Sequence, residues 1–78
     1  MSLFPRLQQT IAITLKVPAS QVMPTTRDED LPAWDSLGQV NLMMAIEQTF
    51  DLMIEVEDFE KLKSVPAILD YLAQQGMQ

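Results

Sequence analysis

Residues 35–50 read DSLGQVNLMMAIEQTF, and they form the central element of the predicted fold. It contains no proline, and Asp35 stands where a helix N-cap belongs, so the stretch predicts one helix that ends near Phe50. Two apolar stripes run along this helix, rotated away from one another, and they consist of Leu42, Ile46 and Phe50 and of Leu37, Val40 and Met44. A helix with two apolar faces is either buried on both or keeps one face for something outside the chain.

An amphipathic pattern upstream predicts a first helix. Ser2 can cap it, and Pro18 ends it near Lys16 or Val17. Its apolar stripe consists of Phe4, Leu7, Ile11 and Leu15. Residues 18–35 then form a long connection, in which the apolar candidates for packing are Val22, Leu31 and Trp34.

Two further helices are predicted after Phe50. Residues 57–62 are long enough for a turn or two of helix, and Ile54 anchors the connection that leads to them. Ser64 caps a last helix that ends near Gly76, and its apolar stripe consists of Val65, Ile68, Leu69 and Leu72.

The 78 residues have room for one domain, which we place at residues 1–78. Since no stretch alternates like a strand, the fold is predicted to be all-α, a small four-helix bundle of three main helices and one short helix. The longest apolar run, residues 42–46, is too short for a membrane span, and no signal peptide is recognisable. We therefore expect a cytoplasmic protein. We also expect it to be a monomer.

The missing residue types limit the chemistry. Without cysteine there is no disulfide, thiolate metal site or cysteine nucleophile, and without histidine the commonest general base and neutral metal ligand are absent. The protein is therefore not expected to be an enzyme by itself.

Charge is unevenly spread along the chain. The net charge is −6, but ten of the eleven acidic residues lie from Asp28 to Glu60, where there is no lysine or arginine. Nucleic acid is excluded as a partner, because its phosphates need the opposite sign. The acidic surface either steers basic proteins toward the chain or only keeps it soluble. The acidic runs lack the ligand spacing of a calcium loop, so no metal site is predicted and a calcium-dependent switch is the weakest alternative.

Ser36 opens the predicted central helix. It is a poor nucleophile, because no histidine can serve as its base and no Gly-x-Ser-x-Gly motif surrounds it. It lies at the positive end of the helix dipole, however, where free backbone N–H groups stabilise an anion. A phosphodiester on its hydroxyl would be held by those groups.

The stretch Trp34-Asp35-Ser36-Leu37 and the residues after it resemble the acyl carrier protein superfamily. The matching positions continue through Val40, Leu42, Ile46, Glu47, Phe50-Asp51, Ile54, Glu60-Lys61, Val65, Ala67 and Asp70-Tyr71-Leu72. In that family an Asp-Ser-Leu signature opens the second helix, and its serine carries 4′-phosphopantetheine. The resemblance implies that a phosphopantetheinyl transferase attaches this cofactor, taken from coenzyme A, to Ser36 beside Asp35. The cofactor thiol would then hold an acyl, aminoacyl or polyketide group as a thioester.

The resemblance also implies a use for each apolar face. The positions that contact partner enzymes in the family correspond to Leu37, Val40, Asn41, Met44, Glu47 and Ile54. The lining between helices, where many relatives shelter short chains, corresponds to Leu42, Ile46, Phe50, Leu62 and Ile68. The implied partners are the transferase, an acyl- or aminoacyl-loading enzyme and a downstream synthase or transferase.

The central helix departs from carriers of bacterial fatty acid synthesis, which usually keep several acids there. Glu47 is the only carboxylate between Ser36 and Phe50, and the uncharged positions include Gly38, Gln39, Asn41, Gln48 and Thr49. Because partner choice depends on facing charges, this indicates a dedicated, non-housekeeping pathway.

Two residues near the signature keep alternative interpretations. Gly38 is either an exposed position without a role or room for the arm or the transferase. Trp34 either resembles the carriers of specialised pathways or only packs the loop. For the whole protein, the alternative from another class is an unmodified acidic helical module, an adaptor or inhibitor that binds a basic protein.

Overall fold

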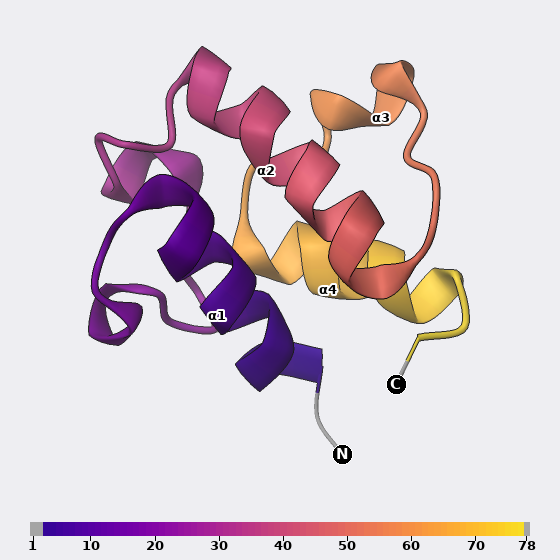
Figure 1. Cartoon of the computed structure of the whole chain (residues 1–78), viewed down its shortest axis with the longest axis horizontal. Helices are drawn as coiled ribbons and strands as arrows, with labels where there is room; N and C mark the ends of the chain where they lie inside the picture. The colour runs from indigo at the N-terminus through magenta and orange to yellow at the C-terminus, as the bar shows by residue number, and fades with distance from the viewer. Residues whose placement is uncertain (1–2, 78) are drawn as a thin grey trace.

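The computed structural model describes residues 3–77, and these form four α-helices. The helices are α1 (Leu3–Leu15), α2 (Ser36–Phe50), α3 (Val56–Phe59) and α4 (Val65–Gln74), with two 3-10 turns, Ala19–Gln21 and Asp28–Asp30, between α1 and α2. α1 packs against α2 and α4, and the short α3 packs against α2 (Figure 1). The predicted all-α bundle is thereby confirmed, while the predicted cap Ser2 lies outside the described residues. No helix among residues 3–77 is both long and apolar enough to cross a membrane.

Two helix boundaries differ from the prediction by a few residues. α1 ends at Leu15, because Lys16 adopts a left-handed conformation with a φ angle of 59°, which stops an α-helix. The short helix covers Val56–Phe59 instead of 57–62, because the next N–H groups along the chain bond to carbonyl oxygens only three residues back. These tighter turns do not continue an α-helix.

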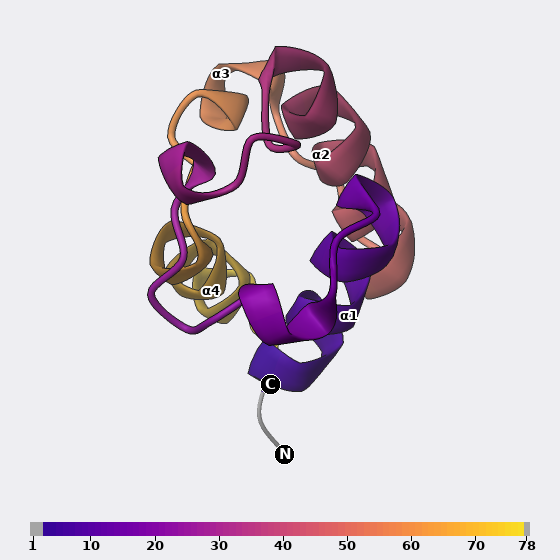
Figure 2. The same ribbon diagram turned by 90° about the vertical axis from the view of Figure 1, so that its left-hand side faces the viewer.

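The long connection between α1 and α2 is fixed by burial and by backbone hydrogen bonds. Its apolar side chains pack inward as predicted, with at most 5% exposed for Val22, Leu31 and Trp34. The Asp28 N–H donates to the Lys63 carbonyl oxygen (2.9 Å), and the Val65 N–H donates to the Thr26 carbonyl oxygen (2.8 Å). Figure 2 shows the connection passing beside the linker between α3 and α4 on its way to α2. The segment that leads into α2 is therefore held by α4 as well as by the core.

α2 has one buried and one exposed apolar face, as its two stripes predict. The buried stripe, at most 4% exposed, consists of Leu42, Ile46 and Phe50. The other stripe is open to solvent, with exposed fractions of 71% for Leu37, 43% for Val40 and 50% for Met44. The first face forms the core, and the second has no covering element among the described residues.

α1 also holds the carboxyl end of α2. The Arg6 guanidinium donates to the Thr49 carbonyl oxygen (2.8 Å) and lies 4.5 Å from the centre of the Phe50 ring. A cation here balances the negative pole of the helix dipole and is attracted to the aromatic face. Position and direction of α2 are therefore set from both ends.

Candidate functional site

The site begins at the amino end of α2, where Asp35 and Ser36 lie. Asp35 has an extended backbone, and its Oδ1 accepts a hydrogen bond from the Gly38 N–H at 2.8 Å, which confirms it as the N-cap. Ser36 is the first residue of the helix and is exposed. The cap holds the start of the helix, and the Ser36 hydroxyl is left accessible.

Two backbone donors of the first turn of α2 are free. An α-helix leaves its first N–H groups without intrahelical partners. Asp35 accepts from that of Gly38, whereas those of Ser36 and Leu37 have no hydrogen-bond partner within residues 3–77. Negative charge at such a helix end is stabilised by about 0.3–1 kcal/mol. An anionic group on the Ser36 hydroxyl would lie at this positive end.

Gly38 is buried, so the prediction that it is exposed is wrong. A Cβ atom on it would lie 2.4 Å from the Ala33 carbonyl oxygen and 3.1 Å from Leu15 Cδ2. The connection from α1 passes directly against α2 at this point, and only a residue without a side chain fits. The space is filled by the protein itself and leaves no room for an arm or a transferase.

Gln39 is the site residue that the sequence reasoning missed. The sequence indicates only that it is one of the uncharged positions of the central helix, but the residue is buried, with 6% of its surface exposed. Its Oε1 accepts a hydrogen bond from Trp34 Nε1, and its Nε2 donates to the carbonyl oxygens of Phe59 (2.7 Å) and Leu62 (3.0 Å). A signal was present, because residue 39 lies one helical turn before the buried Met43 and shares its face. Trp34, 4% exposed, packs the loop.

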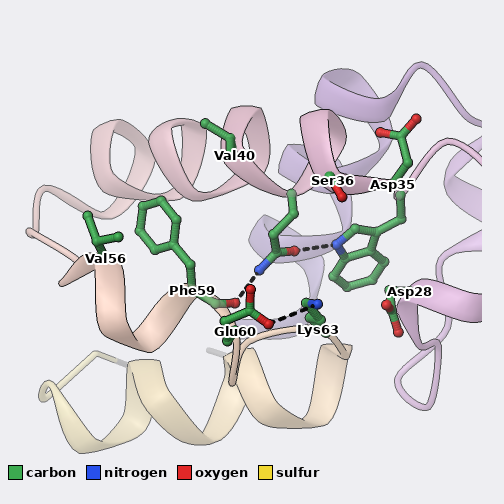
Figure 3. A pocket seen from close by; sticks show the side chains of 10 residues that line it. Asp28, Asp35, Ser36, Val40, Val56, Phe59, Glu60 and Lys63 are labelled. Carbon is green, nitrogen blue, oxygen red and sulfur yellow. Dashed lines mark hydrogen bonds and ion pairs between the residues drawn. The ribbon is translucent and has the colours of Figure 1, made fainter.

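A cavity of about 500 Å³ adjoins Ser36 between α2 and α3, a volume within the range of small-ligand sites. Its apolar walls are formed by Trp34, Val40, Val56 and Phe59. Its charged residues are Asp28, Asp35, Glu60 and Lys63, of which the last two form an ion pair with 3.2 Å between Nζ and Oε2 (Figure 3). Gln39 also lines this cavity. A group attached to Ser36 has a hollow beside it in which to lie.

The five residues predicted to line a cargo pocket are core residues. All are at most 4% exposed, and they are Leu42, Ile46, Phe50, Leu62 and Ile68. None of them lines the cavity that adjoins Ser36. The structure confirms their place in the core and separates them from that cavity.

The predicted docking residues divide between surface and core. Those exposed on α2 are Leu37, Val40, Asn41 and Met44. Ile54 is 6% exposed and packs in the core, so it does not belong to an exposed docking face. The half-buried Glu47 accepts a hydrogen bond from the Ile54 N–H at 2.8 Å, so its carboxylate fastens the connection after α2. The prediction omitted Val56, which is 72% exposed and shares the cavity with Val40.

Acidic side chains at the surface pair with the two lysines of the linker between α3 and α4. Lys61 Nζ lies 3.8 Å from Asp58 Oδ1, and Lys63 pairs with Glu60. Exposed pairs of this kind contribute about 0–1 kcal/mol to stability. Within residues 3–77, no group of three or more aspartates and glutamates is placed to hold a metal ion.

The sequence is similar to known proteins over nearly its whole length. Residues 5–72 match the family model described as a phosphopantetheine attachment site. An acyl carrier protein from Bdellovibrio bacteriovorus is 38% identical over 76 residues, which cover 97% of each chain. Both matches include the amino end of α2 and its two apolar faces.

Proposed function

The chain belongs to the acyl carrier protein family and has 4′-phosphopantetheine as its covalent prosthetic group, and we propose that Ser36 bears it. The protein then carries an acyl, aminoacyl or polyketide group as a thioester and presents it to partner enzymes. The position of the Ser36 side chain is the main support for this proposal. Its hydroxyl is exposed at the first position of α2, where two N–H groups are free.

The surroundings of Ser36 fit a phosphodiester. The free N–H groups of Ser36 and Leu37 place the positive end of the helix dipole beside the anion. Because Asp35 caps the helix, the Ser36 hydroxyl is not needed as a capping group and can be esterified without loss of the fold. Lys63 lines the adjoining cavity, but its ammonium pairs with Glu60, so the backbone N–H groups are the donors offered to the anion.

The prosthetic group supplies the thiol that this cysteine-free chain lacks. Ser36 anchors it, and the adjoining cavity offers the apolar side chains of Val40, Val56 and Phe59. Apolar walls with a few polar groups are typical of sites that hold small molecules. The chain's own residues therefore anchor and shelter the carried group, and bond-making and bond-breaking are left to the partners.

Partner enzymes dock on the exposed face of α2 in this proposal. Leu37, Val40 and Met44 offer an apolar surface, with Asn41 beside them. The Glu47 carboxylate already binds the Ile54 N–H, so the acidic groups open to a partner lie mainly outside α2. Such a face suits partners with an apolar contact and basic residues at its edge, among them the transferase, a loading enzyme and a downstream synthase.

We place the protein in a dedicated pathway and not in housekeeping fatty acid synthesis. Gly38 and Gln39 are buried, so they cannot contact a partner. Asn41, Gln48 and Thr49 are exposed and carry no charge. Partner choice depends on facing charges, so enzymes that recognise an acidic helix would bind this one weakly. Genes for an adenylating enzyme, acyltransferase or ketosynthase of a separate pathway beside this gene would support the assignment. An adjoining housekeeping fatty acid operon would contradict it.

The attachment is tested by mass spectrometry of the intact protein. With coenzyme A and a broad-specificity transferase, the wild type should gain the mass of one phosphopantetheine, and Ser36→Ala should gain none. Ser20→Ala removes an exposed hydroxyl from a 3-10 turn and should be labelled fully. Labelling of Ser36→Ala would place the attachment elsewhere.

The alternative, an unmodified adaptor or inhibitor, is tested on protein from its native host. The carrier should be found with phosphopantetheine attached while its pathway is active. A stable population without the cofactor under those conditions would favour the adaptor.

A further inference from the structure

We propose that Gln39 determines which groups this carrier shelters, because its side chain closes the way from the cavity beside Ser36 into the core. A short acyl group can lie in the cavity, and a longer alkyl chain cannot continue between the helices. The inference rests on the proposed attachment at Ser36.

The Gln39 side chain is held by three hydrogen bonds. Its Oε1 accepts from Trp34 Nε1, and both hydrogens of its Nε2 are directed to carbonyl oxygens, those of Phe59 at 2.7 Å and Leu62 at 3.0 Å. A glutamine amide has two donor hydrogens, so its donor capacity is filled. The side chain thus bridges α2 to the preceding loop on one side and to the end of α3 on the other.

Gln39 stands at the boundary between the cavity and the core. It is a wall residue of the cavity, and the Leu62 carbonyl that it binds belongs to a core residue that is 4% exposed. One turn further along the same face of α2 lie Leu42 and Met43, both 0% exposed and neither in contact with the cavity. A chain that reached them from Ser36 would have to pass the Gln39 amide.

Moving the amide aside is costly. It would leave the Trp34 indole N–H and the Leu62 carbonyl oxygen without their present partner in a buried setting, while the Phe59 carbonyl oxygen would keep only the Leu62 N–H at 3.2 Å. Loss of these three hydrogen bonds, two of which leave a buried group unpaired, offsets the burial of about three to nine methylene groups, and octanoyl adds about six to acetyl. Burial of a short chain in the core therefore releases too little free energy to displace the amide, and short chains stay in the cavity.

The first test uses the wild-type protein loaded from acetyl-, butyryl- and octanoyl-coenzyme A. In methyl NMR spectra, butyryl loading should shift the signals of Val40 and Val56 and leave those of Leu42, Ile46 and Ile68 unchanged. The Tm of the octanoyl form should equal that of the acetyl form to within about 1 °C, since no further methylene groups become buried. Shifts of the core methyl signals with a Tm that rises with chain length would overturn the proposal.

The second test removes the Gln39 amide with Gln39→Ala and uses Gln9→Ala, an exposed glutamine of α1 that lies outside the docking face, as control. Octanoyl loading should raise the Tm of Gln39→Ala by several degrees over its acetyl form and shift its core methyl signals. Gln9→Ala should behave as the wild type. A Gln39→Ala protein that shows no dependence on chain length would overturn the proposal. If this variant does not fold, the wild-type spectra still decide.

The two proposals fail in different ways. If Ser36 is not the attachment site, Ser36→Ala still gains the acyl-phosphopantetheine mass. If the attachment is right and the role of Gln39 is wrong, loading depends on Ser36 but the octanoyl chain perturbs Leu42, Ile46 and Ile68 in the wild type.

Discussion

Gly38 in α2 lies so close to Ala33 that a Cβ atom at position 38 would approach the Ala33 carbonyl oxygen to 2.4 Å. Alanine normally favours a helix over glycine by about 1 kcal/mol. Here the contact is with backbone, which cannot rotate away as a side chain would. The contact joins the connection from α1 to the first turn of α2, two residues from Ser36.

Gly38→Ala should therefore lower the free energy of unfolding by about 1–3 kcal/mol, against the helix propensity. Urea denaturation measures the change. Asn41→Ala, exposed on the same helix, should change stability by no more than about 0.5 kcal/mol. A Gly38→Ala protein as stable as the wild type would show that the connection does not press on α2.

Asp35 should contribute to stability through its cap alone. Asp35→Ala removes the acceptor of the Gly38 N–H and should lower the free energy of unfolding by about 0.5–2 kcal/mol. Asp35→Asn keeps an acceptor oxygen at the same place and should retain most of the stability. Equal losses in the two variants, measured by urea unfolding, would mean that the charge and not the cap matters.

The exposed face of α2 should affect partner recognition without affecting the fold. Leu37 is 71% exposed, and Ile13 on α1 is 72% exposed, so the two form a matched pair of surface residues. Leu37→Ala should reduce kcat/KM of the phosphopantetheinyl transferase about tenfold, the size of a central interface contact. Ile13→Ala should leave it unchanged, and both variants should keep the wild-type Tm. A loss of the same size from Ile13→Ala would mean that docking is not confined to α2.

Stability at alkaline pH should depend on Tyr71 of α4. Its hydroxyl lies 3.5 Å from the Met53 carbonyl oxygen. Burial raises the pKa of Tyr71 above its ordinary value of 10.0. Nearby carboxylates raise the pKa of the phenol further, and they belong to Asp58, Glu55 and Glu47. Tyr71 therefore loses its proton at a lower pH in the unfolded chain than in the folded protein. Its contribution to the free energy of unfolding is complete below pH 10 and is lost as the pH rises through the pKa of the folded state.

Two measurements check this dependence. Absorbance at alkaline pH reports Tyr71 alone, because the chain has a single tyrosine, and the midpoint in the folded protein should exceed that in urea. Between about pH 9 and 12, the free energy of unfolding of Tyr71→Phe should fall less than that of the wild type, because the variant has no phenol to ionise. Identical alkaline profiles for the wild type and Tyr71→Phe would contradict the raised pKa.

The helices, the cap at Asp35, the two faces of α2 and the family could all be predicted from the amino-acid sequence. Each of these depends on residues a few positions apart. A cap joins residues 35 and 38, and an apolar stripe repeats every three or four residues, so both can be found along the chain without knowledge of the fold.

The inward orientation of particular polar and small residues of α2 could not be predicted without the folded structure. Gln39 meets carbonyl oxygens 20 and 23 residues away, and Gly38 meets a loop whose course no local pattern specifies. The same holds for Glu47, whose carboxylate binds the Ile54 N–H, whereas the burial of Ile54 agrees with its predicted role as the anchor of the connection after α2. Burial and hydrogen bonding between distant segments depend on how the connections pack, and that packing exists only once the chain is folded.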